Sequence, residues 1–84
     1  MEKILITGAS GDIGRAIALE FAKDSDAYIY IHYSTNKDAA LETLGLVGDE
    51  RGSLVQFDLR DKNGIESVLK ELDIDILVNN AAVI

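Results

Sequence analysis

Three glycines, at positions 8, 11 and 14, stand at the junction between a predicted strand and a predicted helix. Residues 4–6 before them form an apolar, largely β-branched run that ends at Gly8, which is typical of a buried strand. After them Ile13, Ile17 and Phe21 recur every four residues, so a helix with one apolar face is predicted. A strand, a glycine loop and a helix together predict the beginning of an α/β fold.

Three more strands are predicted further along the chain. Residues 27–33 are rich in β-branched and aromatic side chains, and residues 54–57 form a third run that ends at Asp58. Residues 76–78 are apolar without polar alternation, a pattern expected of a strand covered on both faces of its sheet.

Two further helices are predicted between these strands. The first is capped by Thr35 or Asn36 and ends at Gly45 or Gly48. The second follows Asp61, which is also a good cap. The apolar positions of these helices are Ala40, Leu41, Leu44 and Val47 in the first, and Ile65, Val68, Leu69 and Leu72 in the second.

The alternating order βαβαβαβ predicts a doubly wound parallel sheet with right-handed crossovers and helices on both faces. Its four strands are expected in the order 3-2-1-4, as part of one domain over residues 1–84 with no second domain. The order reverses beside the first strand, and ligands bind such sheets at that reversal, outside the carboxyl ends of the strands.

The glycine loop lies at this reversal. Gly8 would allow a tight turn with positive φ, Gly11 would let the backbone approach a diphosphate, and Gly14 would allow close packing of the helix. The free N–H groups and the dipole of the helix N-terminus favour a phosphate there. A purely structural turn is the alternative interpretation of this glycine triplet.

Charge and composition exclude other classes. Fifteen acidic and eight basic residues give a net charge of −7, which disfavours binding to nucleic acid or to an anionic membrane. The chain has no cysteine, so disulfides and thiolate metal sites are excluded, and no metal-ligand cluster is predicted. The apolar N-terminal run is too short for a signal peptide or a membrane span, and we expect a cytoplasmic protein.

Three segments resemble the short-chain dehydrogenase/reductase family. TGASGDIGRAIA at residues 7–18 is similar to its TGxxxGxG loop, FDLRD at 57–61 to its D-[VL]-x-D segment, and DILVNNAA at 75–82 to its DILVNNAG segment. The resemblance covers the chain from end to end and implies the N-terminal half of a Rossmann-type dinucleotide-binding domain. The cofactor-binding residues that the resemblance implies are Gly8, Ala9, Ser10, Gly11, Asp12, Ile13, Gly14, Tyr33, Ser34, Asp58, Leu59, Asn80, Ala81 and Ala82.

Two residues depart from the family pattern. Asp12 stands where the family usually has glycine, and Ala82 replaces the last glycine of NNAG. Asp12 either caps the helix or brings its carboxylate close to the phosphates, and Ala82 adds a Cβ to the ribose wall. Both changes are expected to weaken affinity for the cofactor without moving its site.

NADP(H) is the preferred cofactor, with NAD(H) as the alternative. NAD-binding relatives usually carry a carboxylate at the end of the second strand, where Tyr33 and Ser34 stand in this chain. Ser34, Thr35 and Asn36 offer neutral hydrogen bonds to a 2′-phosphate, and Lys37 offers a charge. Arg15 lies nearby on the first helix and is expected to be solvated.

No catalytic residue is assigned to this chain. The resemblance implies a catalytic Ser and a Tyr-x-x-x-Lys pair on a later helix, and neither is identified in residues 1–84. Tyr33 and Lys37 match that spacing, yet they fall across a predicted strand-to-helix junction. His32, the sole histidine, lies within a strand and is expected to be packed rather than catalytic.

The resemblance implies an oxidoreductase that interconverts a carbonyl and an alcohol. Reduction of 3-oxoacyl groups on acyl carrier protein is one candidate reaction, and the substrate would be a small or carrier-bound carbonyl compound. The alternative is a non-catalytic dinucleotide-binding or sensing module. The apolar end at residues 81–84, beside an unpaired sheet edge, predicts that the chain is part of a longer protein. The resemblance implies a homo-oligomer, and because it places the catalytic residues on a later helix, the 84 residues alone are expected to be inactive.

Overall fold

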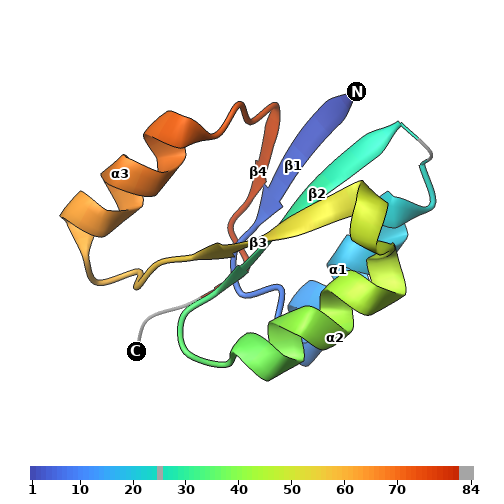
Figure 1. Ribbon diagram of the computed structural model, residues 1–84, viewed down its shortest axis with the longest axis horizontal. Helices are drawn as coiled ribbons and strands as arrows, with labels where there is room; N and C mark the ends of the chain where they lie inside the picture. Colours follow the sequence, from blue (N-terminus) through green and yellow to red (C-terminus); the bar gives the residue numbers. More distant parts are fainter. Residues whose placement is uncertain (25, 82–84) are drawn as a thin grey trace.

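A computed structural model describes residues 1–24 and 26–81. Its strands are β1 (Glu2–Ile6), β2 (Ala27–Tyr33), β3 (Gly52–Gln56) and β4 (Ile76–Val78). They form one parallel sheet in the order β3-β2-β1-β4, visible in Figure 1. The predicted α/β class and strand order are confirmed.

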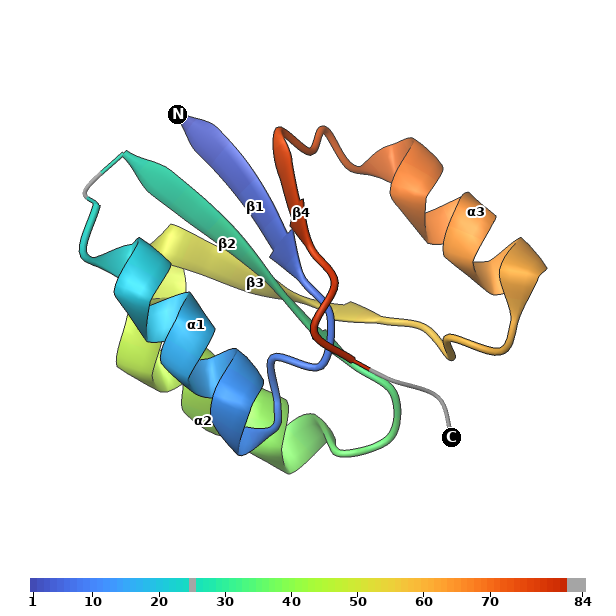
Figure 2. The ribbon, with the colours of Figure 1, turned by 180° about the vertical axis from the view of Figure 1, so that it is seen from behind.

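Helices cover both faces of the sheet. Figures 1 and 2 show α1 (Asp12–Ala22) and α2 (Lys37–Val47) side by side on one face, and α3 (Lys62–Glu71) on the other. A short 3₁₀ turn, η1 (Asp49–Arg51), joins α2 to β3 and was not expected from the sequence. No helix in the described part of the chain is long and apolar enough to cross a membrane.

The predicted helix caps can now be assigned. The side chain of Asn36 accepts a hydrogen bond from the Ala39 N–H and caps α2, so Thr35 is not the cap. Asp61 caps α3 by accepting from the Gly64 N–H, as predicted. Of the two candidate helix ends, Gly48 follows α2 with a φ of 112°, and Gly45 lies inside the helix.

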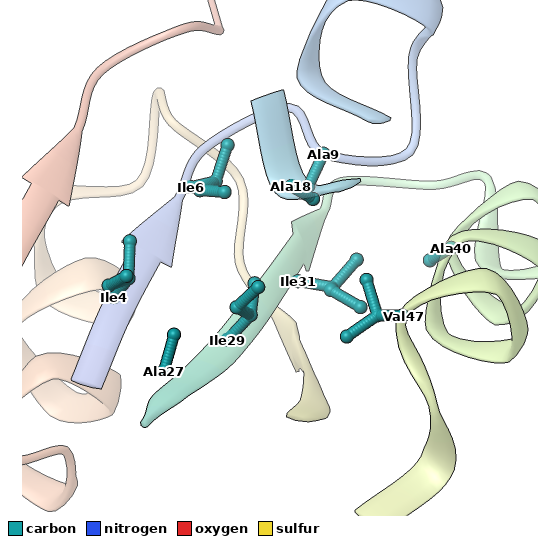
Figure 3. Packing of buried hydrophobic residues seen from close by; sticks show 9 residues of the cluster. All are labelled: Ile4, Ile6, Ala9, Ala18, Ala27, Ile29, Ile31, Ala40 and Val47. Carbon is teal, nitrogen blue, oxygen red and sulfur yellow. The ribbon is translucent and has the colours of Figure 1, made fainter. Parts of the chain in front are cut away.

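The main core lies between the sheet and the α1/α2 layer. Side chains alternate across a strand, so Ile4 and Ile6 of β1 share one face with Ile29 and Ile31 of β2. Figure 3 shows these four isoleucines facing the small side chains of the two helices. Alanines at the helix contacts, Ala18 and Ala40, are fully buried. Their small size lets α1 and α2 approach the sheet closely.

The opposite face is covered less completely. No residue of α3 is fully buried, and Leu77 on β4 is 59% exposed. Ile76 and Val78 pack against the core on the α1/α2 side, whereas Leu77 points to the α3 side. The predicted strand order already places β4 at the edge of the sheet, but the expectation that both of its faces are covered is wrong, because α3 leaves Leu77 exposed.

Candidate functional site

The glycine loop connects β1 to α1 at the reversal of strand order, because β1 has β2 on one side and β4 on the other. Gly8 has a φ of 69°, the left-handed conformation that the sequence predicts. A Cβ at this position would also lie 3.0 Å from the Cβ of Ala81 and 3.1 Å from Nδ2 of Asn80. Gly8 is therefore needed both for its backbone conformation and for the close approach of the chain after β4.

Gly14 and Gly11 serve different purposes. A Cβ on Gly14 would lie 2.7 Å from Cα of Ala9 and closer still to the Gly8 carbonyl oxygen, so α1 rests directly on the loop backbone. A Cβ on Gly11 would meet only the Gly8 oxygen at 3.6 Å, an ordinary contact. The fold itself thus requires glycine at 14, whereas at 11 it leaves room on the exposed side of the loop.

The N-terminus of α1 is left without a side-chain cap. Asn36 and Asp61 cap the other two helices, but the N-cap of α1 is Gly11, and no described side chain bonds to its first turn. Asp12 is the first helical residue and is exposed, so of the two alternatives given for Asp12, capping of the helix is excluded. The cap position is occupied by a residue without a side chain, which leaves the first-turn N–H groups of α1 available to an anion.

Thr7 ties the glycine loop to the segment after β4. Its hydroxyl oxygen accepts hydrogen bonds from the N–H groups of Asn80 and Ala81, both at 3.0 Å. Its own N–H donates to the Val78 carbonyl at 3.0 Å, and Nδ2 of Asn80 reaches the Gly8 oxygen at 3.4 Å. The predicted site residues Asn80 and Ala81 are thereby brought against Gly8, through a threonine to which the sequence analysis gave no role.

Asp58 follows β3 at the same edge of the sheet and is partly exposed. Its Oδ1 accepts from the backbone N–H and Nε of Arg60, and its Oδ2 accepts from a terminal guanidinium nitrogen of Arg60. These hydrogen bonds and the charge of Arg60 lower the pKa of Asp58. Asp58 therefore presents a carboxylate whose direction is set by Arg60, and Leu59 lies between the two residues, half-buried.

Tyr33 and Ser34 lie where β2 ends. Tyr33 is half-buried and packs against the core, while Ser34 is exposed and its carbonyl accepts from Nε2 of Gln56. Tyr33 is the last residue of β2 and Lys37 the first of α2, so the two are not one turn apart on a helix. The predicted strand-to-helix junction between these two residues is confirmed.

Arg15 joins the two helices of the core layer. It donates from Nε to the Thr43 hydroxyl, and from a terminal nitrogen to the Ala39 carbonyl and to Glu42. The buried Thr43 hydroxyl also lies 3.0 Å from the Ala9 carbonyl. The prediction that Arg15 is simply solvated is wrong, because its guanidinium links α1 to α2.

The remaining predicted residues differ in exposure. Ala9 is fully buried in the core, Ser10 is half-buried, and Ile13 is 71% exposed at the start of α1. Ala82 lies outside the described residues. An apolar side chain as exposed as Ile13, beside an uncapped helix end, is available to contact a bound ligand.

His32 is buried beneath the site and was not predicted to belong to it. Its Nδ1 accepts from the Gly8 N–H at 2.9 Å, and its Nε2 lies 2.8 Å from the Phe57 carbonyl oxygen. The prediction that His32 is packed is confirmed, but the amino-acid sequence contains nothing that would predict its two hydrogen bonds.

A parallel sheet that reverses its order beside a glycine loop, with an uncapped helix at that loop, is the arrangement of a Rossmann-type doubly wound α/β fold. The sequence profile of the short chain dehydrogenases matches residues 2–84, and the chain belongs to this family.

Relatives in this family are longer than the chain. It is 38% identical over 84 residues to the 3-oxoacyl-acyl-carrier-protein reductase FabG of Haemophilus influenzae, covering 94% of the chain and 34% of that protein. The chain thus spans about a third of the length of this relative.

Two solved structures are similar throughout the chain. The promiscuous reductase LugOII superimposes with a TM-score of 0.86 at 33% identity, covering 99% of this chain and 41% of that one. The landomycin C-6 ketoreductase LanV, solved with bound NADP and rabelomycin, gives a TM-score of 0.84 at 34% identity and covers 98% and 38%.

Proposed function

We propose that this chain binds NADP(H) as the cofactor-binding part of a short chain dehydrogenase. The observation that carries the proposal is the uncapped N-terminus of α1, which lies on a glycine turn at the carboxyl end of β1. A diphosphate there would accept from the free N–H groups, and the helix dipole would stabilise its charge despite the net charge of −7. The bound NADP in LanV supports the choice of cofactor.

The proposed cofactor lies across the edge formed by the ends of the strands. The glycine loop holds the diphosphate, with Ser10, Gly11, Asp12 and Ile13 on its exposed side. Asp58 and Leu59 border the adenine, and Asn80 and Ala81 border the ribose next to the nicotinamide. Ala9 contributes from below by packing the loop. When bound, a nicotinamide dinucleotide supplies or accepts a hydride, and these residues bind and orient it.

The complete protein is proposed to interconvert a carbonyl and an alcohol, with catalytic residues outside these 84 positions. A small or carrier-bound ketone, such as a 3-oxoacyl group on acyl carrier protein, is the proposed substrate class, supported by the name of the Haemophilus relative. We further propose a cytoplasmic homo-oligomer that binds neither nucleic acid nor membrane.

The cofactor preference is tested by titrating the full-length protein with NADPH and with NADH and following nucleotide fluorescence. Tighter binding of NADPH is expected, since no carboxylate at the end of β2 would repel its 2′-phosphate. Tighter binding of NADH would contradict the preference, and binding of neither would contradict the proposed function. NADPH oxidation with a 3-oxoacyl thioester then separates a reductase from a sensing module, which would bind NADPH without oxidising it.

Tyr33→Asp is expected to reverse the preference. A carboxylate at the end of β2 would accept from the 2′-hydroxyl of NADH and repel the 2′-phosphate of NADPH. The ratio of the two dissociation constants should change by about tenfold or more, equivalent to roughly 1.4 kcal/mol. Tyr33→Asn, similar in shape and uncharged, is the matched control and should leave NADPH preferred. An equal change in both variants would show that the tyrosine ring, rather than charge, sets the preference.

A further inference from the structure

The imidazole of His32 contacts two segments that are separate in sequence. His32 is 1% exposed, and it joins the Gly8 N–H, 24 residues before it, to the Phe57 carbonyl, 25 residues after it. The rings of His32 and Phe57 also pack against each other in a tilted arrangement, with centroids 4.0 Å apart.

The partners determine the protonation of the ring. A backbone N–H can only donate, so Nδ1 must carry a lone pair to accept from Gly8. A carbonyl oxygen can only accept, so Nε2 must carry the proton that is donated to Phe57. Both bonds therefore form together only in the neutral imidazole with its proton on Nε2.

The two anchored segments are the two sides of the proposed cofactor site. Gly8 is the positive-φ turn at the start of the phosphate-binding loop. Phe57 directly precedes Asp58 and Leu59, which border the proposed adenine position. Around Phe57, the described hydrogen bonds besides that to His32 include a long one from its N–H to the Tyr33 carbonyl, at 3.4 Å.

We propose that His32 is a positioning residue, whose neutral imidazole holds the glycine turn and the end of β3 at the spacing a dinucleotide requires, so that its protonation weakens cofactor binding. This proposal rests on the proposed function. It goes beyond that function because a buried side chain, which touches neither phosphate nor adenine, sets the distance between the glycine turn and the end of β3.

Protonation would place a second N–H on the ring, directed at the Gly8 N–H, and that hydrogen bond would be lost. Burial lowers the pKa of His32 below its ordinary value of about 6.5, and the hydrogen bond to Phe57 partly offsets this. A lowered pKa means that the neutral form stabilises the fold fully above about pH 6.5 and loses this contribution as the pH falls towards the lowered value. Cofactor affinity is expected to fall at lower pH, as the pH drops through this lowered pKa and the imidazole of the folded protein takes up a proton.

No charged partner of His32 complicates this titration among the described residues. Neither of the two causes that shift its pKa is a charged neighbour, and its two hydrogen-bond partners are backbone groups. Asp58 faces Arg60 instead. Ionisable groups on the elements around His32 include Tyr30 and Tyr33 on β2, Asp12 on α1, Lys37 on α2, Asp58 and Arg60 after β3, and Lys62 and Glu66 on α3.

The test compares His32→Phe and His32→Asn with the unmodified full-length protein. Phenylalanine keeps an aromatic ring of similar size and removes both hydrogen bonds. The Asn Oδ1 atom stands close to where Nδ1 lies, so asparagine can still accept from Gly8 and does not titrate. The dissociation constant of NADPH is measured from about pH 5.5 to about pH 8.5. Circular dichroism melting is run on each protein.

In the unmodified protein, affinity is expected to fall towards the lower pH by more than it does in His32→Phe, whose remaining pH dependence comes from NADPH and other groups. At the upper pH, His32→Phe should bind about tenfold more weakly. His32→Asn should recover most of that loss and bind at the lower pH relatively better than the unmodified protein.

The outcomes separate the two proposals. If the unmodified protein binds no dinucleotide at any pH, the proposed function fails, and the role of His32 fails with it. If it binds NADPH and the folded His32→Phe variant has the same affinity and pH profile, only the role of His32 is overturned. A lower melting temperature with unchanged affinity has the same meaning, because it indicates packing alone. Should His32→Phe not fold, the comparison between His32→Asn and the unmodified protein decides.

Discussion

Replacing Gly14 by alanine is expected to abolish cofactor binding and to destabilise the protein by roughly 3 kcal/mol or more. The new Cβ would overlap the Gly8 carbonyl oxygen and would stand 2.7 Å from Cα of Ala9. Every one of these neighbours is backbone, so no side-chain rotation can relieve the overlap. Either α1 moves away from β1 or the glycine turn changes shape, and each of these changes displaces the N–H groups proposed to bind the diphosphate.

Gly45→Ala is the matched control for this prediction. Gly45 is also a helical glycine, yet a Cβ there meets no atom within 4 Å. Alanine at 45 should leave NADPH affinity unchanged and stabilise α2 by about 0.5–1 kcal/mol, because glycine is the poorer helix former. Urea unfolding and NADPH titration of both variants check the pair. Equal effects of the two substitutions would contradict the account of α1 resting on the loop.

Thr7→Val is expected to cost roughly 1–3 kcal/mol of stability and to weaken NADPH binding about tenfold. Valine has nearly the shape of threonine, so the packing of this buried position is kept. The N–H groups of Asn80 and Ala81 lose the oxygen that accepts from both of them. The segment after β4 would then be held less firmly against Gly8, and Asn80 would leave the proposed ribose position.

Thr7→Ser separates the hydroxyl from the methyl group in this prediction. Serine keeps the acceptor and loses only a methyl, so it should retain NADPH affinity at a cost of about 1 kcal/mol. Affinity measured by titration and stability measured by urea unfolding are compared for both variants. If serine weakens binding as much as valine does, the hydrogen bonds of Thr7 are not what holds Asn80.

The fold could be predicted because its determinants are local. The period of the apolar residues changes between strands and helices along the chain, and Asn36 and Asp61 carry side chains suited to helix caps. The positive φ of Gly8 and the close packing of Gly14 also follow from their positions at a strand end and in a first helical turn. These features need only neighbouring residues for their explanation.

The features that the sequence did not predict depend on contacts between segments that are far apart in sequence. The buried hydroxyl of Thr43 and the guanidinium of Arg15 meet because α1 and α2 lie side by side. The guanidinium of Arg51 similarly donates to the carbonyls of Ala22, Asp24 and Ala27 around the connection to β2. The spacing of residues along the chain gives no indication of such long-range contacts. In the sequence, Arg15 and Arg51 therefore look the same as solvent-exposed polar residues.

The exposure of Leu77 was also mispredicted for a physical reason. An apolar run without alternation indicates that a strand has apolar side chains on both faces, which is true of β4. It carries no information about whether a helix reaches that face, and α3 buries none of its residues fully.

The pairing of β1 with β4 sets the order in which the site can assemble during synthesis. Thr7 and Asn79 are 72 residues apart, so the glycine loop leaves the ribosome long before the segment that completes the site. Closing so long a loop is slow compared with forming a helix. The nascent chain would therefore acquire its proposed nucleotide affinity late, and binding of NADPH would stabilise only chains that have finished folding. At an NADPH concentration one hundred times the dissociation constant, binding would add about 2.7 kcal/mol to the free energy of unfolding.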